Sequence, residues 1–260
     1  MTETLTHNDL DVDDLDALYP AGEPLPESRP HRRVRDNAAS VLEQRFDSRG
    51  DILVASNLNL YYREGDPAAV IEPDVLVVAG VAAAQLQDIQ SYRTFQHGGS
   101  LLFVLEVASK DTASADRGRK RATYASIGVA EYWRVDPTGG ELHPEILQGE
   151  RLHDGHWTPI AVTVDGAGTE RGHSTALDLD IAWRDDELLF HLPGSDQPLN
   201  NLARAETARR RAEAEAAAQA AEAAAQAAEA AAQAAEVARL KELLRRHGSP
   251  EAGRAPDPPG

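Results

Sequence analysis

The sequence contains no cysteine and a single methionine among its 260 residues. Disulfide bonds and thiolate metal sites are therefore excluded. No run of apolar residues reaches the roughly 18–20 residues of a membrane-spanning helix. The acidic N-terminus also lacks the apolar segment of a signal peptide. We therefore expect a soluble, cytoplasmic protein that makes no contact with a membrane.

Basic charge is also scarce, since the formal net charge is −17. Residues 1–28 contain eight acidic residues and no Lys or Arg, residues 29–194 carry a net charge of −8, and residues 195–260 carry −1. This balance excludes a general polyanion-binding surface. Any contact with nucleic acid would have to be local, through a small patch or a metal ion.

Lysine is rare among the basic residues: Lys110, Lys120 and Lys241 are the three lysines of 26 basic residues. An ammonium is a compact donor whose pKa the protein can tune, unlike a guanidinium. Two of the three lysines lie within 14 residues of Glu106. That carboxylate stands near the end of LLFVLEV (101–107), a segment that otherwise belongs in a core, and a buried carboxylate requires a partner.

The chain divides into four segments by composition. The C-terminal part repeats AEAAAQA, with Glu215, Glu222, Glu229 and Glu236 seven residues apart, which predicts one helix over about 201–247. A solvated spacer and a coiled-coil homodimer both remain open, because an alanine seam buries little area. The expected segments are an acidic flexible tail at 1–28, a folded domain at 29–194, an Ala-rich long helix or coiled coil at 195–248 and a disordered tail at 249–260.

The folded domain reads as α/β or α+β. Apolar spacing predicts a helix over 31–46. A second helix is predicted over 114–127, because Asp111, Thr112 and Ser114 are candidate N-cap residues and Gly128 is a candidate C-terminal stop. One helical turn is expected near Leu15 and Leu18. Strands are expected at 51–62, 71–80 and 101–107, as a strand–turn–strand over 131–143, and near 157–164, 177–183 and 187–192.

Two carboxylates stand at matching ends of two apolar strands. Asp74 precedes VLVV, and Glu106 lies near the end of LLFVLEV. If these strands are antiparallel neighbours, pairing residue 74 with 106 also puts 78 opposite 102. Close like charges repel unless a cation joins them. Mg²⁺ (or Mn²⁺) accepts one or two carboxylates, waters and a phosphate oxygen, so Asp74 and Glu106 are the predicted metal ligands.

The helix after the second strand carries Asp116, Lys120 and Tyr124, which are four residues apart and share one face. If that face points to the strand end, Lys120 reaches the scissile phosphate and offsets its developing negative charge. Arg117 and Arg121 lie one step around the helix and are candidates for contacts to backbone phosphates.

Each of these candidate residues also has an ordinary structural interpretation. Asp74 also fits a turn, and Glu106 also fits a pair with an arginine. Asp116 and Lys120 also fit a solvated surface pair, and His31 fits a helix cap or a surface position. No Walker loop, G-x-G-x-x-G or G-x-S-x-G is present. Five further histidines show no metal-ligand spacing: His143, His153, His156, His173 and His191.

A set of motifs resembles the Uma2 family of restriction-type endonucleases, within the PD-(D/E)XK nuclease superfamily. The motifs are EPDVLVVAG, FVLEVASKDT, D-x3-K-x3-Y and GVAEYWRVDP, with GEPLPESRPH and LNLYYREGDP before them. The resemblance covers roughly residues 15–194.

The resemblance implies a restriction-endonuclease-like mixed sheet flanked by helices and a metal-dependent hydrolysis of phosphodiester bonds, with DNA as the expected substrate. Asp74 and Glu106 match the acidic residues of the motif. The usual lysine position is Ala108, and Lys120 on the following helix matches the lysine instead. Asp74, Glu106 and Lys120 are therefore the expected catalytic residues.

Two departures from the family pattern affect the site. The loop at 109–112 carries Lys110, which competes with Lys120 for the catalytic role. The glutamate that many members carry before the first helix is not obvious, and Glu23 and Glu43 are alternatives. Lys110, Asp116, Tyr124 and His31 are candidates for supporting roles.

Two functions follow as hypotheses. The first is a Mg²⁺-dependent endodeoxyribonuclease, which the set Asp74, Glu106 and Lys120 favours. A homodimer through the C-terminal helix, the nuclease domain or both remains open for it. The alternative is a non-catalytic module with a nuclease fold that binds or assembles through its C-terminal helix, which the acidic charge favours.

Overall fold

The computed structural model describes residues 12–21, 28–110, 112–199 and 202–247. It contains two compact units, Met1–Leu202 and Ala203–Gly260. The helices are α1 (Val12–Leu18), α2 (Arg29–Phe46), α3 (Thr94–His97), α4 (Ala113–Ala115), α5 (Arg121–Ser126) and α6 (Leu202–His247), with a 3-10 turn η2 (Ala83–Gln85) and a π turn η3 (Asp116–Lys120). The strands are β1 (Ile52–Ser56), β2 (Asn59–Tyr61), β3 (Val70–Ile71), β4 (Val75–Ala79), β5 (Ser91–Arg93), β6 (Ser100–Val107), β7 (Glu131–Val135), β8 (Leu147–His153), β9 (His156–Pro159), β10 (Val162–Val164), β11 (Glu170–Ser174), β12 (Leu179–Arg184) and β13 (Glu187–His191).

A six-stranded mixed sheet forms the centre of the first unit, in the order β1-β4-β6-β7-β8-β9. Strands β6 and β7 are parallel, and the other neighbours are antiparallel. A four-stranded antiparallel sheet has the order β10-β11-β12-β13, and a three-stranded sheet has the order β3-β2-β5. The prediction of a mixed α+β fold with helices on the sheet and a long C-terminal helix is confirmed.

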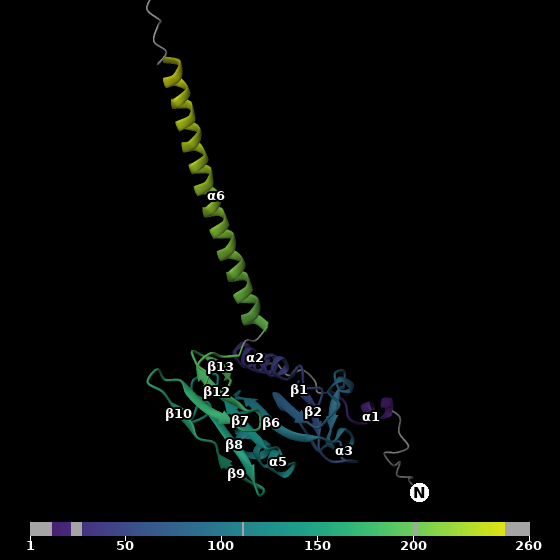
Figure 1. The fold of residues 1–260 in the computed structure, drawn as a ribbon. Coiled ribbons are helices and arrows are strands. Elements are labelled where there is room, and N and C mark those ends of the chain that lie inside the picture. The colour runs from purple at the N-terminus through teal and green to yellow at the C-terminus, as the bar shows by residue number, and fades with distance from the viewer. Residues whose placement is uncertain (1–11, 22–27, 111, 200–201, 248–260) are drawn as a thin grey trace, which may run out of the picture. The chain divides into compact units, whose positions relative to one another are not determined.

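The two faces of the central sheet pack into different cores. On β6, Phe103 and Leu105 join a core shared with α2 and with strands β12 and β13, whereas Val104 joins a core shared with β2 and α5. This separation follows from the alternation of side chains along a strand. Figure 1 shows α2 and α5 on opposite sides of β6. Glu106 follows Val104 on its face, so it points to the side that carries α5.

Helix α2 forms where the apolar spacing predicted it and begins slightly earlier, at Arg29. Ser28 caps the helix by accepting a hydrogen bond from the backbone N–H of His31, and Pro30 occupies the first turn, where no N–H donor is needed. Val34, Ala38 and Leu42 are buried on the side that faces the sheet. The start of this helix is thereby fixed beside the end of β6 that carries Glu106.

Several expectations of secondary structure were wrong in detail. The strand predicted at 71–80 is split into β3 and β4, and the strand predicted near 157–164 is split into β9 and β10. The strand predicted over 51–62 is split into β1 and β2 at Asn57, which has φ of 50°. The helix predicted over 114–127 contains a π turn at Asp116–Lys120. Strands β5, β8 and β11 were not predicted.

The second strand expected within 131–143 is also absent, because a loop follows β7 and strand β8 begins only at Leu147. The reason is the carboxylate of Asp136. It accepts hydrogen bonds from the backbone N–H groups of Thr138, Leu142 and His143. These bonds wrap the loop around one side chain and leave its backbone unavailable for strand pairing.

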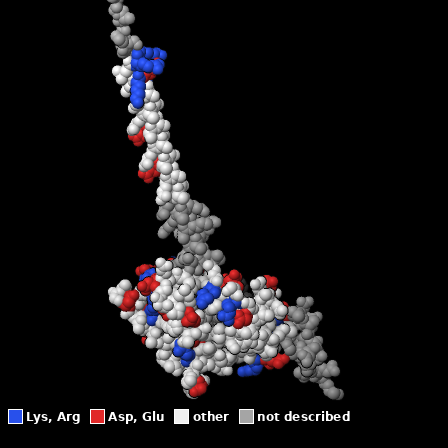
Figure 2. All heavy atoms as spheres, viewed as in Figure 1, with Lys and Arg blue, Asp and Glu red and all other residues white. Residues whose placement is uncertain are grey.

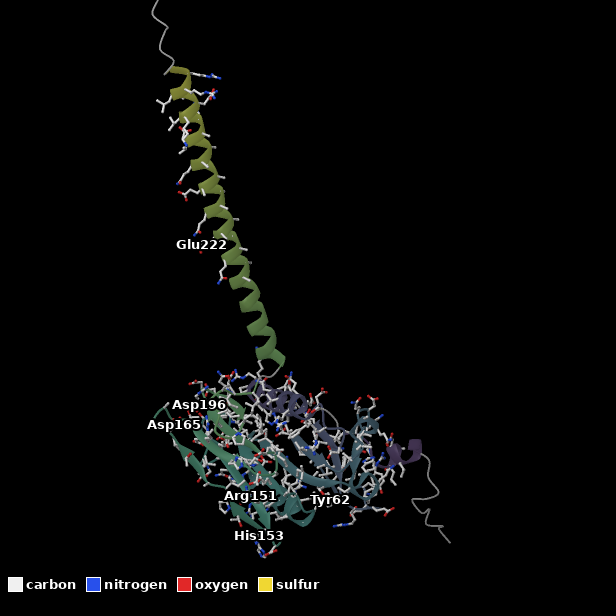
Figure 3. The ribbon with its side chains drawn as sticks, in the orientation of Figure 1. Tyr62, Arg151, His153, Asp165, Asp196 and Glu222 are labelled. Atoms are coloured by element: carbon white, nitrogen blue, oxygen red, sulfur yellow. The ribbon has the colours of Figure 1, made fainter. Side chains whose placement is uncertain are left out.

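Strands β8 and β9 form a hairpin in which His153 lies opposite His156. The two connecting residues, Asp154 and Gly155, both have positive φ, 48° and 76°, as a tight primed hairpin turn requires. Figure 3 labels Arg151 and His153 on this hairpin.

Residues 12–21 of the expected acidic tail form α1 and the segment after it. Leu15 and Tyr19 are buried against Tyr61. The hydroxyl of Tyr19 accepts a hydrogen bond from Gly65 N, and its carbonyl accepts one from Ser91 Oγ. These residues therefore pack on the first unit. Residues 1–11 and 22–27 of the expected tail lie outside the described residues.

Helix α6 runs without interruption from Leu202 to His247, as the seven-residue repeat predicted, and its 46 residues span about 70 Å at 1.5 Å per residue. Val237, Leu240, Leu243 and Leu244 near its end are exposed apolar residues. Among the described helices, none combines the length and the apolar composition needed to cross a bilayer. The tail expected at 249–260 lies outside the described residues.

Candidate active site

Strands β4 and β6 bring Asp74 and Glu106 to the same end of the sheet. Val75 pairs with Leu105 and Val77 with Phe103, and Asp74 Oδ2 accepts a 2.7 Å hydrogen bond from the backbone N–H of Val107. The predicted register therefore holds at the carboxylate end of the two strands.

The same register was wrong at the other end of the two strands. A β-bulge between Val77 and Val78 places Val78 opposite Leu101 rather than residue 102, because a bulge adds one residue to one strand. The shift lies away from the carboxylates and does not affect their alignment.

Glu106 has both carboxylate oxygens engaged and is only 2% exposed. Lys120 Nζ lies 2.7 Å from Oε2, and the hydroxyl of Tyr124 donates to Oε1 at 2.5 Å. Burial raises the pKa of the Glu106 carboxyl well above its ordinary value; the ammonium of Lys120 opposes this shift, and the charges of Asp74 and Asp116 add to it. The alternative interpretation of Glu106, a pair with an arginine, is wrong, because its partners are a lysine and a phenol.

Lys120 lies at the centre of a group of oxygens. Besides Glu106, its Nζ lies 3.4 Å from Asp116 Oδ1 and donates to the backbone carbonyl of Glu72 at 3.3 Å. Burial alone would lower the pKa of the Lys120 ammonium, but Glu106 and Asp116 raise it above its ordinary value. Asp116 is fully buried, so the interpretation of Asp116 and Lys120 as a solvated surface pair is wrong.

Asp74 is held by groups from two elements. His31 Nε2, in the first turn of α2, lies 3.4 Å from Asp74 Oδ2, which also accepts from Val107 N. Burial alone would raise the pKa of the Asp74 carboxyl, but the hydrogen bond and charge of His31, the Val107 N–H and Lys120 lower it. His31 is 5% exposed, so a surface position is excluded for this residue.

A cavity of about 1010 Å³ opens at this end of the sheet. It is lined by the three predicted catalytic residues and by two predicted supporting residues, His31 and Lys110. Asp116 and Tyr124 are not among its lining residues, and they contact Lys120 and Glu106 on the side away from the cavity. Sequence reasoning missed several polar lining residues: Asn57, Asn59, Glu72, Ser109, Arg119 and Thr138.

The two arginines predicted to contact phosphates are engaged elsewhere. Arg121 forms a bidentate pair with Glu150, at 2.6–3.1 Å, and Arg117 donates to the carbonyl of Leu142 at 3.3 Å. Neither lines the cavity, whereas Arg119 does. Arg119 lies in the π turn over Asp116–Lys120.

The two predicted metal ligands, Asp74 and Glu106, both line the cavity. The described residues contain no group of three or more His, Cys, Asp or Glu side chains arranged to hold a metal ion. Mg²⁺ is commonly bound by one or two carboxylates, with waters and substrate oxygens completing its shell, and Asp74 and Glu106 provide two. Glu43 lines a separate cavity of about 540 Å³, and Glu23 lies outside the described residues.

A match to a family model adds independent evidence. The model Uma2, described as "Putative restriction endonuclease", matches residues 11–182, which is well over half of the chain. The chain belongs to the Uma2 family. No curated protein matches it.

Among solved structures, the Uma2 chain is similar to a crystal structure described as "a putative nuclease belonging to DUF820" from Anabaena variabilis. That similarity has a TM-score of 0.38 and 14% sequence identity, and it covers 56% of this chain and 78% of the other. Membership of the Uma2 family indicates a nuclease.

Proposed function

We propose that this Uma2 domain is an endonuclease that hydrolyses phosphodiester bonds, with DNA as its substrate and Mg²⁺ or Mn²⁺ as its cofactor. The observation that carries the proposal is the joint presence of Asp74, Glu106 and Lys120 on one cavity. Each is held there by packed strands or by hydrogen bonds rather than by a surface loop. Family membership supports the nuclease part of the proposal.

Asp74 and Glu106 would hold the divalent ion, which supplies Lewis-acid chemistry when bound. Lys120 remains protonated and places its ammonium beside Glu106. A fixed positive charge there would stabilise the negative charge that develops on the scissile phosphate. Lys110 and Arg119 are exposed and line the same cavity, so they are suited to hold flanking phosphates.

A non-catalytic binding or assembly module is the second candidate. It is favoured by the net charge of −17 and by Glu150, which pairs with both Arg121 and Arg134. Figure 2 shows acidic and basic side chains interspersed on the visible face of the first unit. An excess of acidic charge lowers the non-specific affinity for nucleic acid, so catalysis would depend on the local site.

Cleavage of nucleic acid tests the proposal. Purified protein is incubated with supercoiled plasmid, single-stranded DNA or RNA, in the presence of Mg²⁺, Mn²⁺ or a chelator. We expect metal-dependent nicking of DNA that falls by about 10²-fold or more in Asp74→Asn and Glu106→Gln, the range of effects for groups that act in the reaction.

The control is Glu43→Gln, which changes an acid in the separate cavity and should cleave like the wild type. Absence of metal-dependent cleavage on every substrate would replace the nuclease proposal with the binding-module interpretation.

We also propose that α6 contributes to self-association and takes no part in the catalytic site. Val237 and Leu240 are each 50% exposed, and Leu244 is 72% exposed. Their spacing of three and four residues places them on one stripe, as in a coiled-coil seam. Sedimentation of the full chain and of a chain ending at Leu202 tests this: the truncated chain should be monomeric, and an unchanged number of subunits per particle would leave α6 as a spacer. The cytoplasmic location stays a prediction.

A further inference from the structure

Tyr124 touches the site only through Glu106. Its side chain is fully buried on α5, and its hydroxyl lies 2.5 Å from Glu106 Oε1. It does not line the cavity, so it can reach neither a substrate nor an ion bound there. Any influence on the reaction must pass through the glutamate.

The orientation of the Glu106 carboxylate depends on two donors. Lys120 binds Oε2 and Tyr124 binds Oε1, so rotation about the last side-chain bond would break both contacts. The backbone of Glu106 is itself fixed, because it pairs with Arg134 of β7. Without the phenol, a buried oxygen would lose its donor, which is costly, and only Lys120 would restrain the orientation of the carboxylate.

We propose that Tyr124 is a positioning residue that orients Glu106 for the divalent ion and thereby sets the affinity of the site for that ion. The inference rests on the proposed function for the identity of Glu106 as a metal ligand. Hydrogen-bond partners of ligating side chains commonly control metal affinity in this way.

Tyr132 provides a matched control in the same core. It is also fully buried, and its ring lies 5.1 Å from the ring of Tyr124. Its hydroxyl, however, donates to the backbone carbonyl of Asp116 at 3.0 Å and not to Glu106. Tyr124→Phe and Tyr132→Phe therefore each remove one buried hydroxyl, and only the first removes a donor to the carboxylate.

The experiment measures binding of Mn²⁺ by the full chain with calorimetry, in the wild type and in both variants. We expect Tyr124→Phe to raise the Kd for Mn²⁺ by about 10–100-fold, and Tyr132→Phe to leave it unchanged. Equal losses in the two variants, or an unchanged Kd in Tyr124→Phe, would overturn the proposal.

A second measurement keeps the test independent of any folding defect. In a Glu106→Gln background, adding Tyr124→Phe should cause no further loss of Mn²⁺ affinity, because the carboxylate it orients is gone. A further loss of the same size as in the wild-type background would mean that Tyr124 acts through general stability, and the proposal would fail.

Cleavage assays on the same samples separate this inference from the nuclease proposal. Cleavage by Tyr124→Phe should recover towards the wild-type rate as Mn²⁺ is raised. If the wild type cleaves DNA and Tyr124→Phe shows the same Mn²⁺ dependence, the positioning role is refuted while the nuclease stands. If Mn²⁺ affinity depends on Tyr124 but no substrate is cleaved, the positioning role stands and the nuclease proposal fails.

Discussion

Replacing Lys120 with alanine should affect the site in a way that replacing Lys110 does not. The ammonium of Lys120 lies within 3.4 Å of oxygens from Glu106, Asp116 and Glu72, and its side chain is 13% exposed. Lys110 is exposed at the rim of the same cavity. The two lysines thus offer the same chemical group in two very different environments.

The magnitude follows from these environments. Removing one partner of a buried ion pair typically costs about 3–5 kcal/mol, because the other charge stays buried without compensation. In Lys120→Ala, Glu106 would then take up a proton and lose its ability to bind a cation. We expect the cleavage rate to fall by about 10²–10⁴-fold, the usual range for a group that acts in the reaction.

Lys110→Ala should mainly weaken substrate binding, with a modest change in kcat, because an exposed charge contributes little when water and salt screen it. The assay is the initial rate of plasmid nicking as a function of DNA concentration at saturating Mg²⁺, with circular dichroism to confirm that each variant is folded. Loss of turnover in Lys110→Ala, together with near wild-type turnover in a folded Lys120→Ala, would refute the assignment.

Three further predictions concern the framework around the site. Glu131 is buried and accepts hydrogen bonds from Trp133, Ser174 and other donors, so Glu131→Ala should lower the free energy of unfolding by about 3–5 kcal/mol in urea titrations. A Cβ on Gly149 would lie 2.8 Å from the ring of Trp133, so Gly149→Ala should cost about 1–3 kcal/mol in the same titrations. Burial, with the nearby charge of Arg93, lowers the pKa of His97 to about 4, so part of the stability should be lost as the pH falls from about 6.5 to about 4, because the unfolded chain binds the proton more tightly there.

The pH prediction has a structural basis besides burial. His97 Nδ1 accepts a hydrogen bond from the backbone N–H of Arg93, which requires an unprotonated nitrogen, and only the charge of Asp16 opposes the shift. His97→Gln should therefore show a shallower loss of stability with acid, as followed by urea unfolding at several pH values. An identical slope in the two proteins would contradict this reasoning. If Glu131→Ala or Gly149→Ala were as stable as the wild type, the corresponding prediction would be contradicted.

The part of the site that depends on the alternation of side chains along strands could be predicted from the sequence. Two apolar strands with acids at matching ends were sufficient to place Asp74 beside Glu106, because a period of two and an antiparallel register leave few alternatives. The helical spacing of Lys120 and Tyr124 likewise placed both on Glu106. These features are local patterns that tertiary packing did not alter.

Other features depended on contacts that no local pattern reveals. The spacing of the helix did not predict the π turn at Asp116–Lys120. Nor did it predict that Arg119, rather than Arg117, lines the cavity. His31 fitted a helix cap or a surface position as well as a supporting role, because its contact with Asp74 joins residues 43 positions apart and no local pattern reveals it. The break between β1 and β2 at Asn57 was not predicted either, although an Asn between two strand-like segments is a recognised signal for a turn with positive φ.

The most direct test of the account is the location of Mn²⁺ by anomalous diffraction from crystals of the protein soaked in that ion. The account predicts one anomalous peak in the cavity, within about 2.0–2.6 Å of a carboxylate oxygen of Asp74 and of one from Glu106. It also predicts that this peak is weaker in Glu106→Gln, in which Asp74 alone remains of the two carboxylates. A peak bound by other residues, or carboxylates that stay too far apart to share one ion, would contradict it.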